Sequence, residues 1–264
     1  MTDPIRAADR IRARSVLALA VGQIVTTASP LIFGFSETVP SRAEAVEHSL
    51  VPAIYAFAIW SLIYLGALVF AVWQVLPRNL ANPLARRIGW LAAAMYAINT
   101  VWQIWVPAFG LDWVSAVLLA GEAALGIVAL GRIRDLGRAL TGFERWGAVA
   151  PLGLLTGWVT AASFVGLSST LIATGSTLAD PRQLPVAAAL LSGAIVFCAF
   201  AVNATRSWFQ AAGIVWALVA IAVANVLRAP EPMLALIAAG GVGLVLLARA
   251  APRISGSGPV TAPA

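Results

Sequence analysis

Residues 52–73 read PAIYAFAIWSLIYLGALVFAVW. A helix of ~20 mostly apolar residues is long enough to cross the hydrocarbon core of a bilayer, so this stretch predicts a membrane-spanning helix. Tyrosine and tryptophan in such helices gather at the two membrane–water interfaces, yet Trp60 and Tyr64 lie well inside the run. Their polar ring edges need partners that lipid cannot supply. We therefore expect both side chains to face other helices or a cavity.

The composition of the whole chain indicates a membrane protein. Of its 264 residues, 61% are hydrophobic and 11% are charged, whereas soluble domains are about 25% charged. Segments of spanning length predict eight transmembrane helices, at 15–34, 51–76, 88–108, 113–131, 146–172, 184–204, 208–227 and 232–250. The expected fold class is therefore an all-α polytopic membrane protein.

The distribution of arginine predicts how the chain crosses the membrane. All 17 basic residues are arginine, and basic residues collect in the cytoplasmic loops of membrane proteins. With eight helices and a cytoplasmic N-terminus, only Arg42, Arg182 and Arg228 would lie outside. We therefore predict that both ends of the chain are cytoplasmic. Arginine without lysine is typical of a GC-rich bacterial genome, so we expect the bacterial inner membrane.

The predicted helices divide into two groups. A linker-like loop rich in small and polar residues separates the first five helices from the last three. The expected organisation is an arginine-rich cytoplasmic N-terminus at 1–14, a five-helix bundle at 15–172, a linker at 173–183, a three-helix extension at 184–251 and a disordered tail at 252–264.

The ten tryptophans fall into two classes by position. Six lie near predicted helix ends, as interfacial anchors do, whereas Trp60, Trp102, Trp158 and Trp216 lie inside their spans. At ~1.5 Å rise per residue, the first three come from three helices at overlapping depths in the outer half. We expect these three indoles to share one aromatic chamber that opens outward.

Other side chains share helix faces with these tryptophans, because residues three and four apart lie together on a helix. Phe57 and Tyr64 lie on the face of Trp60, and Asn99 lies on the face of Trp102. Asn99 is a polar group at membrane depth, so it should point at a neighbouring helix or at a ligand. Hydrogen-bonded packing between helices is the alternative.

Glu122 is the one ionisable residue in the middle of a predicted span. A charged carboxyl at that depth is costly, which makes the residue a functional candidate. It could donate a hydrogen bond to Asn99 or Tyr64, balance the charge of a cationic ligand, or relay a proton. A structural hydrogen bond to a neighbouring helix is the alternative.

The spacing of these residues resembles the TspO/MBR family, the tryptophan-rich sensory and translocator proteins. Pro52 lies eight residues before Trp60, and Tyr64 lies four residues after it. The next helix contains NTVW at 99–102, and Trp158 follows Pro151. The resemblance covers residues 15–172, and three further helices follow, so the chain resembles a long form of the family.

The resemblance implies a bundle that binds porphyrins, sterols or similar ligands beneath the loop between its first two helices. That loop, residues 35–50, is called the lid loop below. The ligand-binding residues that we predict are Phe57, Trp60, Tyr64, Asn99, Trp102, Glu122 and Trp158. His48 could ligate a haem iron near the lid loop, although a loop histidine without a second ligand is more often solvated. No tightly bound cofactor is predicted.

The leading hypothesis is a membrane receptor or carrier for a hydrophobic tetrapyrrole-like ligand (porphyrin or haem), a sterol or an isoprenoid, with a sensory or regulatory role. A proton-coupled secondary transporter that uses Glu122 is the alternative. The helices hold no Ser/His/Asp set, paired carboxylates or histidine-rich cluster, so we predict no catalytic or metal-binding residue. Photo-oxidation of a bound porphyrin at tryptophan is the one enzymatic activity left open. The sequence contains no basic patch with interleaved aromatic residues, so no nucleic-acid partner is predicted. Whether the protein forms a homodimer is left open.

Overall fold

The computed structural model describes residues 4–46, 48–176, 180–228 and 230–252, and these residues form helices and connecting turns without a strand. The helices are α1 (Ala7–Val25), α2 (Ser29–Phe33), α3 (Val39–Ala45), α4 (Ile59–Val75), α5 (Pro83–Phe109), α6 (Trp113–Arg134), α7 (Ala150–Ala173), α8 (Leu184–Thr205), α9 (Trp208–Leu227) and α10 (Pro232–Ala250). A 3₁₀ turn at Ile54–Ala58 leads into α4, and a π-helical turn at Glu144–Val149 leads into α7. Apart from residue 252, the predicted disordered tail lies outside the described residues.

Seven helical segments in the described part of the chain are long and apolar enough to cross a membrane. They contain α1 with α2, α4, α6, α7, α8, α9 and α10. Helix α5 is not among them, because Asn99, Gln103 and its tryptophans lower its hydropathy. It nevertheless has 27 residues, or about 40 Å of helix, which exceeds the ~30 Å hydrocarbon core. The predicted all-α polytopic fold class is confirmed, and among the described residues α5 adds a further helix of spanning length to these seven segments.

The first helix begins earlier than predicted, at Ala7 rather than residue 15. Hydropathy excluded its first turns because they carry charge, but the structure pairs the buried charges of Asp9 and Arg12. Arg12 donates to Asp9 at 2.8 Å, and Arg86 of α5 donates to the same carboxylate at 2.7 Å. Arg12 also donates to the carbonyl of Leu80 at 2.7 Å. This ion-pair network allows the start of α1 to pack against α5.

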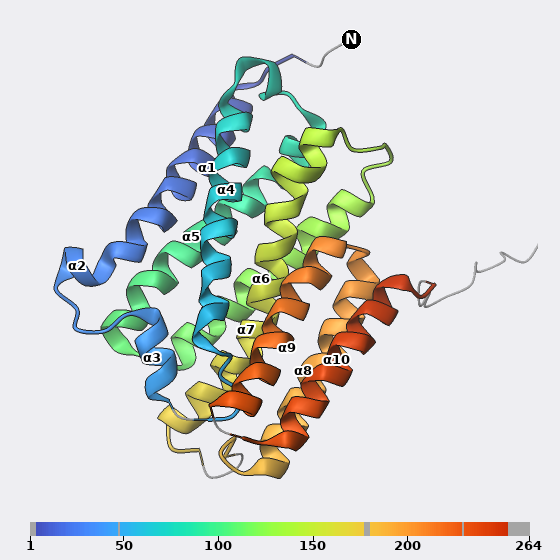
Figure 1. Cartoon of the computed structure of the whole chain (residues 1–264). Helices are drawn as coiled ribbons and strands as arrows, with labels where there is room; N and C mark the ends of the chain where they lie inside the picture. The colour runs from blue at the N-terminus through green and yellow to red at the C-terminus, as the bar shows by residue number, and fades with distance from the viewer. Residues whose placement is uncertain (1–3, 47, 177–179, 229, 253–264) are drawn as a thin grey trace, which may run out of the picture.

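Two hydrophobic cores run through the molecule. The first lies among α1, α4, α5, α6 and α7, and the second among α8, α9 and α10. Helix α9 joins them, because it packs along α7 (Figure 1). A Cβ atom on Gly157 of α7 would lie 2.1 Å from the carbonyl oxygen of Gln210, and one on Gly213 of α9 would lie 2.6 Å from that of Leu154. The two backbones therefore touch where both helices carry glycine.

Helix α9 also holds the segment that precedes α4. The sequence predicts a helix from residue 51, whereas α4 begins at Ile59. Four hydrogen bonds tie residues 49–56 to α9 and its end: Asn225 to Ser49 O (2.7 Å), Arg228 to Val51 O (2.8 Å), Ala53 N to Ala220 O (3.1 Å) and Trp216 Nε1 to Ala56 O (2.9 Å). The bonds at residues 49–53 are made to α9 and its end instead of within a helix, whereas the Ala56 carbonyl also accepts from the Ile59 amide in the 3₁₀ turn.

The lid loop lies at the end of the bundle where α3 is found (Figure 1). We call this end of the molecule the lid end. Within the loop, α3 begins at a capped residue, because the Thr38 hydroxyl accepts from the amide of Ser41. Arg42 then donates to the carbonyl of Pro107 near the end of α5 at 3.2 Å. The lid loop is thus anchored to α5 on one side and to α9 on the other.

Candidate functional site

Trp60 is the centre of an aromatic cluster drawn from three helices. Its ring centroid lies 5.2 Å from that of Tyr64, in a stacked arrangement. Trp102 of α5 and Trp158 of α7 each lie 6.3 Å away. Phe57 packs edge-on against Trp158 at 5.9 Å. These spacings are typical of attractive aromatic pairs, and they bring together the five aromatic side chains that the sequence singled out.

Four of these aromatic side chains line one cavity of about 60 Å³, called the aromatic cavity below. They are Phe57, Trp60, Trp102 and Trp158. Pockets that hold drug-sized ligands have volumes of about 300–1,000 Å³. The aromatic cavity is therefore closed down in this conformation, and a flat ring system could enter only after its walls move apart.

A second cavity, of about 170 Å³, lies on the other side of Trp60. We call it the side cavity. Phe57, Trp60 and Val39 of α3 line both cavities, and Tyr64 and Gln103 line only the side cavity. Three side chains therefore divide the space beneath the lid loop, and a rotation of Trp60 would change the partition between the two cavities.

Polar groups lie behind the aromatic cluster at membrane depth. The Tyr64 hydroxyl donates to Asn99 Oδ1 at 3.3 Å and accepts from the Gln103 amide. Asn99 and Glu122 are both completely buried, and Glu122 lies beside Asn99. Neither residue lines the two cavities. Of the predicted ligand-binding residues, these two therefore lie outside both cavity walls, and Asn99 is linked to the side cavity through its hydrogen bond with Tyr64.

Several of these buried polar atoms lack partners among the described residues. They include both carboxyl oxygens of Glu122, the amide nitrogen of Asn99 and the indole nitrogen of Trp102. Hydrogen bonds from Glu122 to Asn99 or Tyr64 were considered from the sequence, but neither carboxyl oxygen of Glu122 forms one among the described residues. Unsatisfied buried polar groups cost free energy and are often found at functional sites. The Trp102 N–H is a donor available to a ligand, because this side chain lines the aromatic cavity.

Some residues of the cavity walls were not predicted from the sequence. Gln103 lies four residues after Asn99, so the helical spacing that selected Asn99 also points to it. Ala217 and Ile221 of α9 and Val39 of α3 also line the aromatic cavity. No local signal distinguishes Ala217 and Ile221 from lipid-facing residues, because their role depends on the packing of α9 against α7.

The sequence matches the family model of the TSPO-like protein over residues 13–251. The chain belongs to the TSPO-like protein family. The match extends beyond residues 15–172, where the sequence resemblance lay, and covers α8, α9 and α10 as well. Neither the curated proteins nor the solved structures that we compared contain a match to the chain. Family membership and the apolar helices make it an integral membrane protein of the TspO kind.

His48 of this TSPO-like protein is buried, and the expectation that it is solvated is wrong. Its side chain is 8% exposed, because both ring nitrogens bond within the protein. Nδ1 accepts from the Leu50 amide at 3.3 Å, so Nε2 carries the proton and donates to the Ser169 hydroxyl at 2.9 Å. Neither nitrogen is free for an iron while these bonds hold. His48 therefore fastens the end of the lid loop to α7.

Acid is expected to loosen this contact. Burial, with Arg228 and Arg182 nearby, lowers the pKa of His48 from 6.5 to about 4. Because the folded state then binds fewer protons than the unfolded state, stability falls as the pH drops from 6.5 to about 4, by about 3 kcal/mol. Thermal unfolding in neutral detergent, together with hydrogen exchange at residues 48–53, measures the effect. A His48→Gln variant keeps a donor for Ser169 and should lose this part of the pH dependence. An unchanged pH dependence in that variant would contradict the assignment.

Proposed function

We propose that this TSPO-like protein is a membrane receptor or carrier for a hydrophobic ligand of the tetrapyrrole type, such as a porphyrin or haem, or for a sterol or isoprenoid. The observation that carries the proposal is the convergence of Trp60, Trp102 and Trp158 around one cavity. Indole faces stack on flat conjugated rings, and the burial of aromatic surface dominates such recognition. A bacterial inner membrane is the setting in which we propose that the protein acts.

The proposed role is sensory or regulatory because ligand entry would have to move the lid loop. Val39 and Ala43 of α3 line the aromatic cavity, and so does Pro52 beyond the lid loop. Residues 49–56 are in turn bonded to α9. A ligand that binds only an opened cavity shifts the population toward that conformation. Displacement of the lid loop would then shift α9 and, with it, the two helices packed against α9.

A porphyrin titration of the purified protein tests the proposal. Bound porphyrin accepts energy from nearby indoles, so tryptophan emission should fall in a saturable manner, while the main porphyrin absorption band shifts. The band shift is measured relative to porphyrin in protein-free micelles, because a porphyrin that dissolves in detergent shifts its absorption without any protein. Porphyrins, sterols and isoprenoids that all fail to bind at micromolar concentration would overturn the proposal.

A proton-coupled secondary transporter is the second candidate, and the buried Glu122 favours it. Its carboxyl oxygens have no partner among the described residues. It lies beside Asn99, which is hydrogen-bonded to Tyr64. Tyr64 is in turn hydrogen-bonded to Gln103, and both line the side cavity. Such a row of polar groups could connect a proton site to the lid end. In proteoliposomes with an imposed pH gradient, Glu122→Gln should then abolish gradient-driven porphyrin uptake. Uptake that persists in this variant would exclude Glu122 as the proton site.

A further inference from the structure

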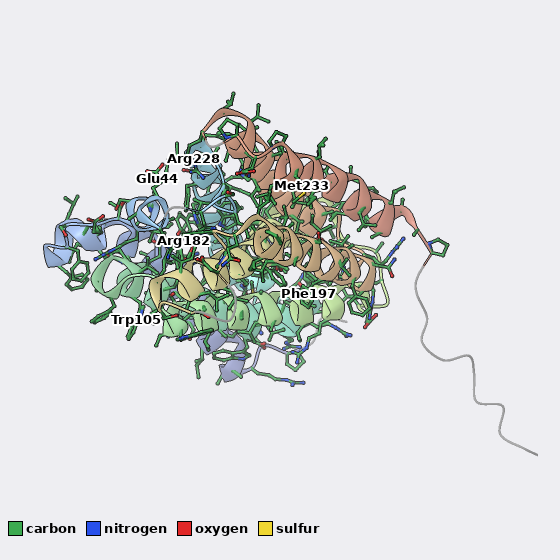
Figure 2. The ribbon with its side chains drawn as sticks, turned by 90° about the horizontal axis from the view of Figure 1, so that it is seen from below. Glu44, Trp105, Arg182, Phe197, Arg228 and Met233 are labelled. Atoms are coloured by element: carbon green, nitrogen blue, oxygen red, sulfur yellow. The ribbon has the colours of Figure 1, made fainter. Side chains whose placement is uncertain are left out.

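A third cavity, of about 450 Å³, lies at the lid end beside the aromatic cavity. We call it the basic cavity. Its walls include Glu44 of α3, His48, Arg182 before α8 and Arg228 at the end of α9. Figure 2, which views the molecule from the lid end, shows Glu44, Arg182 and Arg228 on adjoining elements of this face. Unlike the aromatic cavity, this one is lined by charged side chains.

Among the described residues, two guanidinium groups and the carboxylate of Glu44 line the basic cavity, and Asp180 lies beside one of the two guanidinium groups. Arg228 donates to the Val51 carbonyl at 2.8 Å, and no carboxylate among the described residues forms an ion pair with it. Arg182 lies 3.5 Å from Asp180 and keeps 58% of its side chain exposed. A guanidinium has five N–H donors, so both side chains retain donors for an oxyanion.

A side-chain hydrogen bond links a wall of the basic cavity to a wall of the aromatic cavity. His48 lines the first, Ser169 lines the second, and the two are 2.9 Å apart. Val51 of the basic cavity is followed directly by Pro52 of the aromatic cavity. When the contact between His48 and Ser169 opens, an apolar chamber and a cationic chamber become neighbours. A ligand with an apolar body and an anionic head fits that combination.

We propose that Arg182 and Arg228 bind the anionic head, a carboxylate or phosphate, of an amphipathic ligand whose apolar body occupies the aromatic cavity. The inference rests on the proposed function and narrows its ligand class to anionic amphipaths. It also assigns a role to the part of the chain beyond α7, because both arginines come from it. Arginine suits the task, since its planar fork binds carboxylate and phosphate oxygens in pairs.

The test uses two pairs of probes, in which each anion is compared with its neutral ester. Protoporphyrin IX is compared with its dimethyl ester, and dodecanoate with its methyl ester, in neutral detergent. The variant is Arg182→Gln with Arg228→Gln, in which glutamine can still donate to the Val51 carbonyl. Arg182→Gln alone leaves that lid contact intact. Arg42→Gln is the matched control, because Arg42 also lies at the lid end but does not line the basic cavity.

The wild-type protein should bind each anion more tightly than its ester. The double variant should lose about tenfold in affinity for the anions and keep its affinity for the esters, because the charge-assisted hydrogen bonds from the two guanidinium groups act only on the anions. Arg182→Gln alone should lose part of this preference, and Arg42→Gln should lose none. Equal binding of anion and ester by the wild-type protein, or equal losses for both in the double variant, would overturn the inference.

The same experiment separates this inference from the proposed function. If neither porphyrin binds but dodecanoate is still preferred through the two arginines, the anion site stands and the tetrapyrrole assignment falls. If both porphyrins bind equally and independently of the arginines, the tetrapyrrole assignment stands and the anion site falls. Phosphatidylglycerol that displaces dodecanoate in an arginine-dependent way would identify a lipid headgroup as the source of the anion. Without displacement, a free amphipath is the source.

Discussion

Replacing Gly157 by alanine is expected to lower the free energy of unfolding by about 3 kcal/mol, at the upper end of the usual cost of overpacking. The added methyl carbon would lie 2.1 Å from the backbone oxygen of Gln210 and 3.1 Å from the Cα of Gly213. Backbone atoms cannot rotate away as a flexible side chain can, so α7 and α9 must separate. Thermal unfolding in detergent measures the loss.

Gly193→Ala is the matched control for this variant. Gly193 also lies inside a predicted membrane span, on α8, and a Cβ atom there meets nothing within 4 Å. Alanine favours a helix over glycine by about 1 kcal/mol, so this variant should be as stable as the wild-type protein or slightly more stable. Equal melting temperatures for the two variants would contradict the close approach of α7 and α9.

The second large effect is expected from filling the aromatic cavity. Ala161 of α7 lines this cavity and is 7% exposed. In Ala161→Leu, the added carbons occupy space that a ring ligand needs, so porphyrin affinity should fall at least about tenfold, equivalent to about 1.4 kcal/mol. Equilibrium titration by porphyrin absorbance measures this, and thermal unfolding checks that the variant is folded.

Ala120→Leu supplies the control for the filled cavity. Ala120 lies on α6 and is exposed on the outside of the bundle, away from the aromatic cavity. Its substitution adds the same carbons in the same kind of helix, and the affinity for porphyrin should be unchanged. Wild-type affinity in a folded Ala161→Leu protein would show that porphyrin binds elsewhere.

Much of the fold could be predicted from the sequence because hydropathy acts over whole helices. The last two helices begin and end at the predicted residues, 208–227 and 232–250. The start of α1 could not be predicted in this way. Its buried Asp9 is paired with Arg86, which lies far away in the sequence, so hydropathy alone placed the helix too late. Hydropathy is a local measure, so it does not predict a helix end that depends on ion pairs between distant residues.

The candidate site, too, could be predicted from the sequence only in part. Trp60, Trp102 and Trp158 could be grouped from depth and helical spacing, since both follow from the regular rise and turn of a helix. The contribution of α9 could not be predicted, because it depends on the backbone contact at Gly157 and Gly213. Glycines in spans are common in membrane proteins, so their presence does not identify the partner helix. The burial of His48 was missed for the same reason, because Ser169 lies 121 residues away.

Site-resolved photo-oxidation can show whether a ligand binds among Trp60, Trp102 and Trp158. A bound porphyrin under light converts dissolved oxygen into singlet oxygen, which oxidises the nearest indoles, and peptide mass spectrometry identifies the modified tryptophans. Trp102 and Trp158 are only 5% and 3% exposed, whereas Trp146 and Trp208 are 68% and 53% exposed. With less porphyrin than protein, we predict that Trp60, Trp102 and Trp158 are oxidised first, despite their burial. Oxidation that follows exposure, with Trp146 and Trp208 modified first, would contradict the account.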